Sequence, residues 1–498
     1  MAVSGALAPL FAAFPGQSLL VVGEAMLAAY LHGSSGRLCR EAPVPIVAVD
    51  GRTDVPGGAA NAAVNVRALG ARVSLLSVIG DDADGAALRA ALEARGVDTA
   101  HVLVDPSRRT LAKQRVFAGA QMLVRFDSGT TARVDRARES QVVTRLGELF
   151  GRHDAVIVSD YGYGILTPHV IATLAALQAR APRVIVADSK TLGAYRDVGV
   201  TAVKPNYDEM LRLLGARGAA RGAARAELVA RHGRRLLEAT GAQIAAVTLD
   251  RDGAVFLERG RPSYRTYARP ADHARAAGAG DTFTSALALA LAAGGDVAAC
   301  AEIASAAAAV VVAKEGTAAC SVAELRGYVA GEDKVAPDLA TLLGRLETLR
   351  RAGKRIVLTN GCFDILHSGH ITYLNAAKAL GDVLVVGLNT DASVRRLKGE
   401  ARPINTLDDR AAVLAGLSAV DQIVAFDEHT AVELCAAVRP HVFVKGGDYT
   451  RERLPEAAVV ESHGGQVRIL TFVRDRSTSS IIERVRAAQD PTPARRLA

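Results

Sequence analysis

The stretch RIVLTNGCFDILHSGH, at residues 355–370, contains the structural unit from which this chain is predicted to be built. Its apolar run at 356–359 has the length and β-branched content of a buried strand, and a glycine-containing loop follows it. The residues after that loop can begin a helix, so the stretch predicts the strand–loop–helix unit of a parallel α/β fold. Ligands of such folds bind in these loops, at the carboxyl ends of the strands.

The same unit recurs along the chain. Short runs rich in β-branched residues alternate with helical stretches, and most of these runs are followed by Gly, Asp or Asn. The other predicted strands cover residues 19–22, 73–78, 155–158, 184–187, 245–249, 383–388, 422–425 and 441–444. The sequence therefore predicts an α/β fold in each half of the chain.

The length of 498 residues exceeds that of one ordinary domain. Residues 328–337 mix Gly, Asp, Lys and Pro, and a helix-like stretch at 339–351 leads into the strand at 356. We therefore expect a first domain over residues 1–335, a linker helix over 336–351 and a second domain over 352–498.

The composition narrows the classes of protein. The net charge is +8, but the arginines are scattered and aromatic residues make up only 4% of the chain. This combination favours phosphorylated small molecules over nucleic acid as ligands. The five cysteines include no CxxC pair, so a reducing cytoplasm is expected and a disulfide framework or a zinc site is not.

The longest apolar region, residues 285–313, does not predict a membrane span. It is interrupted by Gly294, Gly295 and Asp296, and it carries Glu302. A membrane-spanning helix needs about 20 consecutive apolar residues. We expect two buried, alanine-rich helices here and no association with a membrane.

Gly278-Ala279-Gly280-Asp281 precedes the first of these helices. Small residues let an anion approach the free N–H groups at a helix start. A carboxylate beside them can accept the proton of a hydroxyl that attacks a phosphoryl group. On these four residues alone, a glycine turn with a capping aspartate is an equally good interpretation.

Four other glycine-containing or polar loops favour the chemical interpretation, at residues 56–61, 160–162, 188–190 and 204–209. Together with residues 278–281 they resemble the ribokinase-like (PfkB) family of carbohydrate kinases over residues 19–331. The resemblance implies that Asp281 is the catalytic base and that Gly278, Ala279 and Gly280 form an anion hole. It places Gly57, Gly58 and Asn61 near the sugar. It places near ATP and its Mg²⁺ the residues Asn206, Tyr207, Asp208, Glu209 and Thr248. The Mg²⁺ is expected to arrive with ATP, with no metal cluster made by the protein.

Within that family, residues 41–46 and the segments 113–115 and 125–127 resemble the heptose 7-phosphate kinase branch. Lys113 and Arg115 could hold a sugar phosphate, although ordinary strand-surface charge is the alternative interpretation. The chain departs from the family pattern at Glu24 and Ala28, where aspartates are usual, and at Arg275. The missing carboxylate at Arg275 argues against a monovalent-cation site.

In the second half, His367 and His370 are three residues apart at a predicted helix start. Two imidazoles and several N–H groups can bind a triphosphate while charge shifts in the transition state. A substrate phosphate can then attack the α-phosphate of ATP without a protein nucleophile. The rival interpretation is a metal site, but a third ligand at suitable spacing is not evident.

Further motifs follow in order at residues 391–394, 398–404, 445–449 and 476–481. Together with residues 359–370 they resemble, over residues 355–485, the HxGH cytidylyltransferase-like nucleotidyltransferases, which have a Rossmann-like fold. The resemblance implies that His367 and His370 are catalytic. It also implies contacts with the nucleotide from Asn360, Gly361, Phe363, Lys398, Arg402, Lys445, Gly447, Asp448, Ser477, Thr478 and Ser479.

The order of the two halves resembles the bifunctional heptose 7-phosphate kinase and heptose 1-phosphate adenylyltransferase family. This implies phosphorylation of heptose 7-phosphate at C1 and adenylyl transfer to heptose 1-phosphate, giving ADP-heptose for the lipopolysaccharide core. It also implies a homodimer formed through the kinase half. Two alternatives remain: an enzyme for another sugar or polyol phosphate that could use CTP, and an inactive kinase half that serves as a scaffold.

Overall fold

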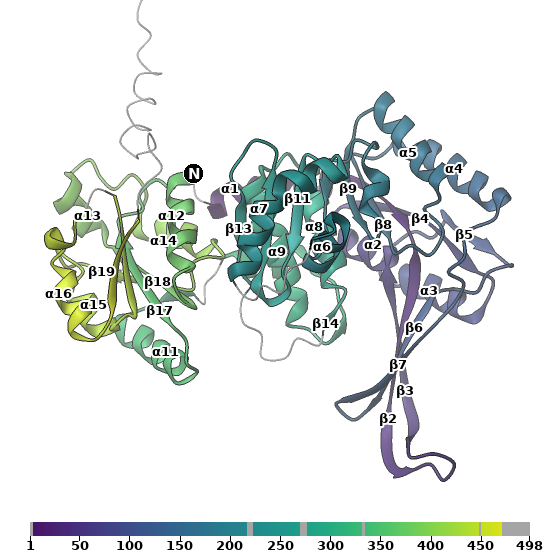
Figure 1. Cartoon of the computed structure of the whole chain (residues 1–498), viewed down its shortest axis with the longest axis horizontal. Helices are drawn as coiled ribbons and strands as arrows, with labels where there is room; N and C mark the ends of the chain where they lie inside the picture. Colours follow the sequence, from purple (N-terminus) through teal and green to yellow (C-terminus); the bar gives the residue numbers. More distant parts are fainter. Residues whose placement is uncertain (1–2, 217–222, 269–275, 331–333, 448–449, 471–498) are drawn as a thin grey trace, which may run out of the picture. The chain divides into compact units, whose positions relative to one another are not determined.

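The computed structural model describes residues 3–216, 223–268, 276–330, 334–447 and 450–470. The chain divides into two compact units (Figure 1), one over Pro9–Arg326 and the other over Gly327–Ala498 together with Met1–Ala8. The predicted boundary near residue 335 stays a prediction.

A nine-stranded sheet forms the centre of the first unit. All neighbouring strands are parallel except at one edge, where β12 runs antiparallel to both of its neighbours. In spatial order the strands are β13 (Tyr264–Thr266), β12 (Ala254–Glu258), β11 (Ile244–Thr248), β10 (Ala202–Val203), β9 (Val184–Ser189), β8 (Ala155–Asp160), β1 (Ser18–Gly23), β4 (Arg72–Gly80) and β5 (Val102–Asp105).

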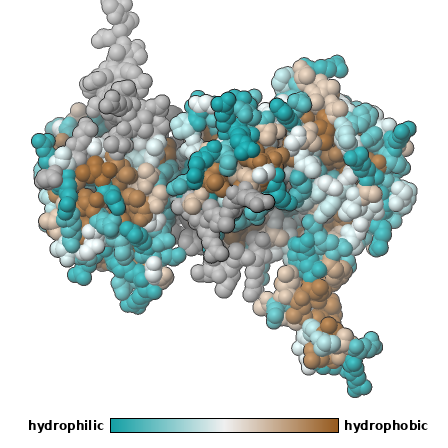
Figure 2. All heavy atoms as spheres, viewed as in Figure 1, coloured by the Kyte–Doolittle hydropathy of each residue, from teal (hydrophilic) through white to brown (hydrophobic). Residues whose placement is uncertain are grey.

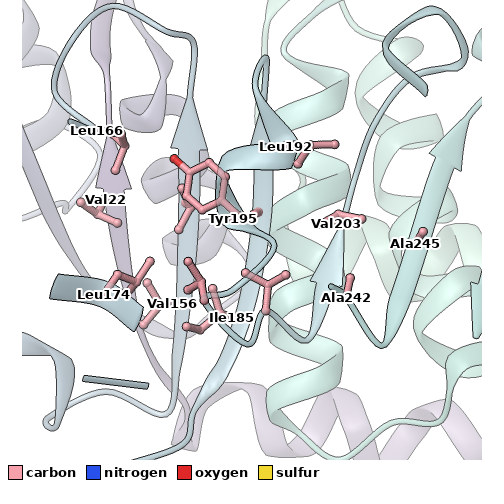
Figure 3. Close-up of a cluster of buried hydrophobic side chains, with 14 of the residues drawn as sticks. Val22, Val156, Leu166, Leu174, Ile185, Leu192, Tyr195, Val203, Ala242 and Ala245 are labelled. Carbon is pink, nitrogen blue, oxygen red and sulfur yellow. The ribbon is translucent and has the colours of Figure 1, made fainter. Parts of the chain in front are cut away.

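Helices cover both faces of this sheet. On one face, apolar side chains of the strands pack in one large core (Figure 3) against α4 (Arg136–Phe150), α5 (Pro168–Arg180), α6 (Tyr207–Leu214) and α7 (Ala223–Thr240). The other face is covered by α2 (Ala59–Ala68), α8 (Ala279–Ala292) and α9 (Val297–Val312). Helices α8 and α9 are the two buried alanine-rich helices expected from the sequence, and no helix among the described residues is long and apolar enough to cross a membrane.

A four-stranded sheet projects from the first unit as an arm (Figure 1). Its order is β3 (Pro45–Gly58), β2 (Ala25–Leu38), β6 (Ala112–Ala118) and β7 (Gln121–Ser128). Strand β2 is buried where it leaves the main body and exposed towards its end. The start of β2 and the end of β3 therefore lie against the main body, and so does Lys113 near the start of β6.

The first unit also contains α3 (Ala83–Glu93), β14 (Ala276–Ala277) and β15 (Gly316–Thr317). Helices α1 (Val3–Ala13) and α10 (Val322–Ala330) extend across the limits of this unit. Strand β14 directly precedes helix α8 and pairs in parallel with β15, which follows α9.

The second unit contains a six-stranded parallel sheet. In spatial order its strands are β16 (Val335–Ala336), β19 (Gln422–Phe426), β18 (Val383–Asn389), β17 (Ile356–Gly361), β20 (Val442–Gly446) and β21 (Gln466–Leu470). Its helices are α11 (Leu339–Arg351), α12 (Ser368–Lys378), α13 (Asp391–Lys398), α14 (Leu407–Ala415), α15 (Val432–Val438) and α16 (Glu456–Ser462).

Helix α11 is the segment that the sequence predicted as a linker. It buries Leu342 and Leu346 in a core that also contains Ile356 and Leu358 of β17. The segment therefore contributes to the hydrophobic core of the second unit. The α/β prediction for both halves is confirmed, and each of the predicted strands is present.

Candidate active sites

The first candidate site lies where helix α8 begins. Gly278 precedes the helix with φ +89°, and a Cβ on this residue would lie 2.4 Å from Nδ2 of Asn61. Only glycine fits both the left-handed backbone and this close approach. The next turn carries Asp281, which is buried with 7% of its surface exposed.

Both carboxylate oxygens of Asp281 accept hydrogen bonds. The hydroxyl of Tyr161 donates to Oδ1 at 2.8 Å, and Nδ2 of Asn61 donates to Oδ2 at 2.9 Å. Sequence reasoning gave Tyr161 no role, although it lies in a loop that was singled out after β8. Asn61 was expected near the sugar, and the structure shows that its amide holds the carboxylate of the predicted base.

The environment of Asp281 suits a general base. Burial raises its pKa to about 6, while the hydrogen bonds from Asn61 and Tyr161 act in the opposite direction. The carboxyl is therefore mostly ionised at neutral pH and still more basic than an exposed aspartate. A base works best when its pKa lies near the operating pH.

An ion pair between the buried Lys204 and the half-buried Asp188 lies beside the predicted anion hole. Nζ of Lys204 is 3.0 Å from Oδ2 of Asp188, and it lies 3.5 Å from where a Cβ on Gly280 would be. Burial opposes the charge of Lys204, but Asp188 outweighs it and raises the pKa of the ammonium. Burial likewise raises the pKa of Asp188, a rise that Lys204 only partly offsets. A fixed positive charge therefore faces the helix start where a phosphoryl group would lie.

The predicted ATP segment begins helix α6. Asn206 and Glu209 form a capping box, in which each side chain accepts the backbone N–H of the other residue. Asn206 also forms an isolated parallel β-bridge with Thr248 at the end of β11, so these two predicted residues are neighbours. Tyr207 is buried beneath the guanidinium of Arg225, which lies 4.6 Å from its ring centroid, and Asp208 is exposed.

The predicted sugar residues approach the base from the arm. A Cβ on Gly58 would lie 2.6 Å from the carbonyl of Glu24 and 3.2 Å from Cε2 of Tyr161. Lys113 on β6 holds its ammonium 5.1 Å from the centroid of the Tyr161 ring. Burial lowers the pKa of Lys113, and Asp281 is among the charges that act on it.

Two further predicted residues lie in the same arm. Gly57 pairs with Met26 across strands β3 and β2. Arg115 lies two residues beyond Lys113, with its guanidinium 5.2 Å from the ring centroid of Tyr30.

The departures from the family pattern have different surroundings. Glu24 is completely buried, and burial together with Asp160 raises its pKa to about 7. Its carboxylate accepts the backbone N–H groups of Tyr161 at 2.7 Å and Ile165 at 3.1 Å. Ala28 is buried in the arm, and Arg275 lies outside the described residues.

The second candidate site lies at the end of β17 and the start of α12. His367 caps the helix, and its Nδ1 accepts the N–H of Gly369 at 3.2 Å. The rings of His367 and His370 are 4.0 Å apart, and Phe363 lies 5.5 Å from His370. Burial, with His367 nearby, lowers the pKa of His370 to about 4, so its imidazole is neutral at pH 7.

The strand end next to these histidines carries other predicted residues. Nζ of Lys445 donates to Oδ1 of Asn360 at 2.7 Å, and burial lowers the pKa of this lysine. Gly361 ends β17, and Gly447 follows β20. Asp448, Ser477, Thr478 and Ser479 lie outside the described residues.

Two basic residues predicted to contact the nucleotide, Lys398 and Arg402, differ in their exposure and contacts. Lys398 is exposed at the end of α13, whereas Nε of Arg402 lies 2.5 Å from the buried carboxylate of Asp364. Burial acts to raise the pKa of Asp364, but the N–H groups of Asn405 and Ile404 together with Arg402 outweigh it and lower that pKa. Arg402 is therefore fixed to the loop that contains the histidines.

Sequence reasoning missed Arg410. Its guanidinium is fully buried and donates to the carbonyl of Cys362 at 2.7 Å and to Asp391 at 2.7 Å. Within the parts of the chain that the structure describes, no three His, Cys, Asp or Glu side chains form a group that could hold a metal ion.

The fold and these two sites define a carbohydrate kinase joined to a nucleotidyltransferase. Residues 17–324 match the family described as pfkB family carbohydrate kinase, and residues 358–484 match the family described as cytidylyltransferase-like. The chain is also similar to a ribokinase from Arabidopsis thaliana solved with ribose and ATP (TM-score 0.50, 18% identity). That likeness covers 63% of this chain and 98% of the other. Phosphofructokinase-2 from Escherichia coli has a TM-score of 0.52 at 18% identity over the same shares. These likenesses confirm the ribokinase-like fold of the first half.

Relatives along the whole chain narrow the class. The protein named Bifunctional protein HldE in Pseudomonas aeruginosa is 42% identical over 94% of this chain and 97% of its own length. The protein of the same name in Geobacter sulfurreducens is 41% identical over 96% and 97%. The chain belongs to the HldE family of bifunctional proteins, and it is a carbohydrate kinase and an adenylyltransferase. The relatives give no support to the two alternatives.

Proposed function

We propose that this enzyme carries out two steps of ADP-heptose synthesis. The first half transfers the γ-phosphoryl group of ATP to the anomeric hydroxyl of heptose 7-phosphate, which gives the 1,7-bisphosphate. The second half joins heptose 1-phosphate to ATP and releases pyrophosphate. Because the product of the first step carries one phosphate more than the substrate of the second, a separate phosphatase must act between them.

The observation that carries the kinase assignment is the buried Asp281 beside the helix start at Gly278–Gly280. The carboxylate accepts the proton of the attacking hydroxyl. The free N–H groups of α8 and the ammonium of Lys204 stabilise the charge on the transferring phosphoryl group. Lys113 and Arg115 hold the 7-phosphate of the sugar, close to the loop that carries Tyr161.

ATP lies along the segment that begins α6, with its Mg²⁺. The carboxylates of Asp188 and Glu209 would hold this ion, because hard cations prefer oxygen ligands. In the structure Asp188 is paired with Lys204 and Glu209 with Lys190. The ion would neutralise charge on the phosphates during transfer. Thr248 lies beside Asn206 and would line the nucleotide side of the site.

In the second half, the phosphate of heptose 1-phosphate attacks the α-phosphate of ATP. His367 and His370 bind the triphosphate at the start of α12 together with the loop at Asn360–Phe363. Because His370 is neutral, it acts as a hydrogen-bond donor and contributes no full positive charge. Lys445 and Arg402 supply positive charge nearby.

The arm is proposed to join two copies of the chain. Its described surface carries exposed apolar side chains (Figure 2), and we propose that the arm of a second copy covers them. These residues are Leu38, Val44, Ile46, Val49, Met122, Val124 and Phe126. Replacing Val124 and Phe126 together by lysine should convert a dimer into a monomer in sedimentation. A wild-type monomer, or a variant that still forms dimers, would contradict this arrangement.

We place both reactions in the cytoplasm, where ATP is available and where the five free cysteines would stay reduced. Mass spectrometry of products from the whole enzyme, ATP, Mg²⁺ and heptose 7-phosphate tests the function. The 1,7-bisphosphate is expected alone, and ADP-heptose only when a phosphatase is added. Absence of the bisphosphate would refute the kinase assignment, and product formation with CTP but not with ATP would refute the adenylyl assignment.

A further inference from the structure

We propose that Tyr161 is a positioning residue for the kinase reaction, which fixes and tunes the catalytic base through its hydroxyl. This inference rests on the proposed kinase function. Tyr161 follows strand β8, and its hydroxyl donates to Oδ1 of Asp281 at 2.8 Å. The two residues are 120 positions apart in the sequence, so the contact exists only in the folded protein.

Towards Asp281, the hydroxyl of Tyr161 acts only as a hydrogen-bond donor. Burial, together with the nearby Asp281, raises the pKa of Tyr161, so the phenol remains protonated. It therefore donates a hydrogen bond to the carboxylate, which stabilises the ionised form and disfavours its protonation. Because Asn61 holds the other oxygen, the orientation of the Asp281 carboxylate is fixed at both ends.

The ring of Tyr161 connects the base with the side of the site where the sugar is expected. Lys113 lies 5.1 Å from its centroid, within the range of a cation–π interaction. On Gly58, a Cβ would lie 3.2 Å from Cε2 of the ring. The ring therefore forms part of the wall between the glycine loop and the predicted phosphate-binding lysine.

Hydrogen bonds to its backbone fix the loop that carries Tyr161. Both carboxylate oxygens of the buried Glu24 accept backbone N–H groups of this loop, one of them from Tyr161 itself. Arg108 donates to the carbonyl of Tyr163 at 3.2 Å. Glu24, where the family usually has an aspartate, thus contacts the backbone of Tyr161 and helps to place its hydroxyl on the base.

Several polar groups act on Asp281, each from a different element. They are Asn61 of α2, Lys113 of β6, Tyr161 after β8, Asp188 of β9 and Lys204 after β10. Among these, Tyr161 is neutral and can be changed by one atom. Removing its hydroxyl takes one donor away from the ionised carboxylate, and the pKa of Asp281 must then rise.

The test is the pH profile of kcat/KM for heptose 7-phosphate in the full-length chain. In Tyr161→Phe, the acid limb should move upward by about 1 pH unit, the shift expected when a charge-assisted hydrogen bond is lost. Most of the activity should return at alkaline pH, and KM for ATP should not change. Tyr163→Phe is the matched control, because this neighbouring ring stacks on Tyr161 at 6.2 Å and its loss of a hydroxyl should leave the limb in place.

A second variant nearly keeps the shape of the side chain and should shift the acid limb in the opposite direction. Replacing Tyr161 by 3-fluorotyrosine makes the phenol a stronger donor, so the acid limb should move to lower pH. An equal loss of rate at every pH in Tyr161→Phe, or an unchanged limb in both variants, would overturn the inference. Failure of the proposed function is seen separately, because wild-type protein would then not turn over heptose 7-phosphate at any pH.

Discussion

Arg410→Met should destabilise the second unit, because Arg410 is fully buried and connects the loop after β17 with the start of α13. The substitution keeps much of the side-chain volume but removes the donors to Asp391 and to the carbonyls of Cys362 and Asn405. A buried acceptor that loses its partner costs about 1–3 kcal/mol. Asp391 is 31% exposed, so water can replace part of what it loses. We therefore expect the free energy of unfolding to fall by about 2–4 kcal/mol.

The measurement is a thermal unfolding experiment on the full-length protein. The loss of adenylyltransferase activity with temperature reports the unfolding of the second unit. A loss of stability of that size should lower the unfolding midpoint of the second unit by roughly 6–12 °C. The kinase rate should not change, because Arg410 lies in the other compact unit. Arg395→Met is the matched control, since this exposed arginine of α13 should change stability by less than about 0.5 kcal/mol. An Arg410→Met protein whose unfolding midpoint lies within about 2–3 °C of the wild-type value would refute the reasoning. A shift that small corresponds to a loss of only about 1 kcal/mol.

Three further predictions concern the active sites. Asp281→Asn should lower kcat of the kinase by about 10²–10⁴-fold while adenylyl transfer continues, and an unaffected kinase rate would contradict its role as the base. Gly278→Ala should disable the kinase and lower its stability, since the new Cβ would lie 2.4 Å from Asn61; a normal rate with normal unfolding would show that the helix start tolerates a side chain. Asp281 has a pKa of about 6 and acts when deprotonated, so kinase kcat/KM should fall to about a tenth on going to pH 5. His370, with a pKa of about 4, stays neutral over that range, so its contribution to adenylyl transfer should not change. Equal losses of the two rates between pH 7 and pH 5 would contradict this difference.

Nine strands of the two large sheets could be predicted because each contains a short apolar run in a buried position. The other six were not predicted, and each of them has only two to five residues: β5, β10, β12, β13, β16 and β21. The arm could not be predicted in the same way. Strand β3 is mostly exposed, and the later half of β2 is too, so neither carries the continuous apolar pattern of a central strand. What holds these strands is their pairing with each other and with β6, which is a property of the fold rather than of either segment.

The residues of the candidate sites also fall into those that the sequence predicted and those that it did not. Asp281 and the histidines were predicted because they lie in local motifs whose chemistry can be read from neighbouring residues. Tyr161 and Arg410 were not. Tyr161 bonds to a residue 120 positions away, and Arg410 bonds to Cys362 and Asp391, which are 48 and 19 positions away, as well as to the nearby Asn405. Asn61 was predicted as a residue of the site, yet its partner in the structure is the base, a contact 220 residues distant.

The two sites handle charge in opposite ways, and the difference follows from what each reaction needs. The kinase must remove a proton from a sugar hydroxyl, which is a weak acid, so it needs a carboxylate whose pKa is raised by burial. The transferase receives a nucleophile that is already an anion, so a base would add nothing. Its half-buried histidines need only to donate hydrogen bonds, and a pKa of about 4 keeps His370 neutral for that purpose. Burial therefore serves both sites, by strengthening the base in one and by removing an unneeded charge in the other.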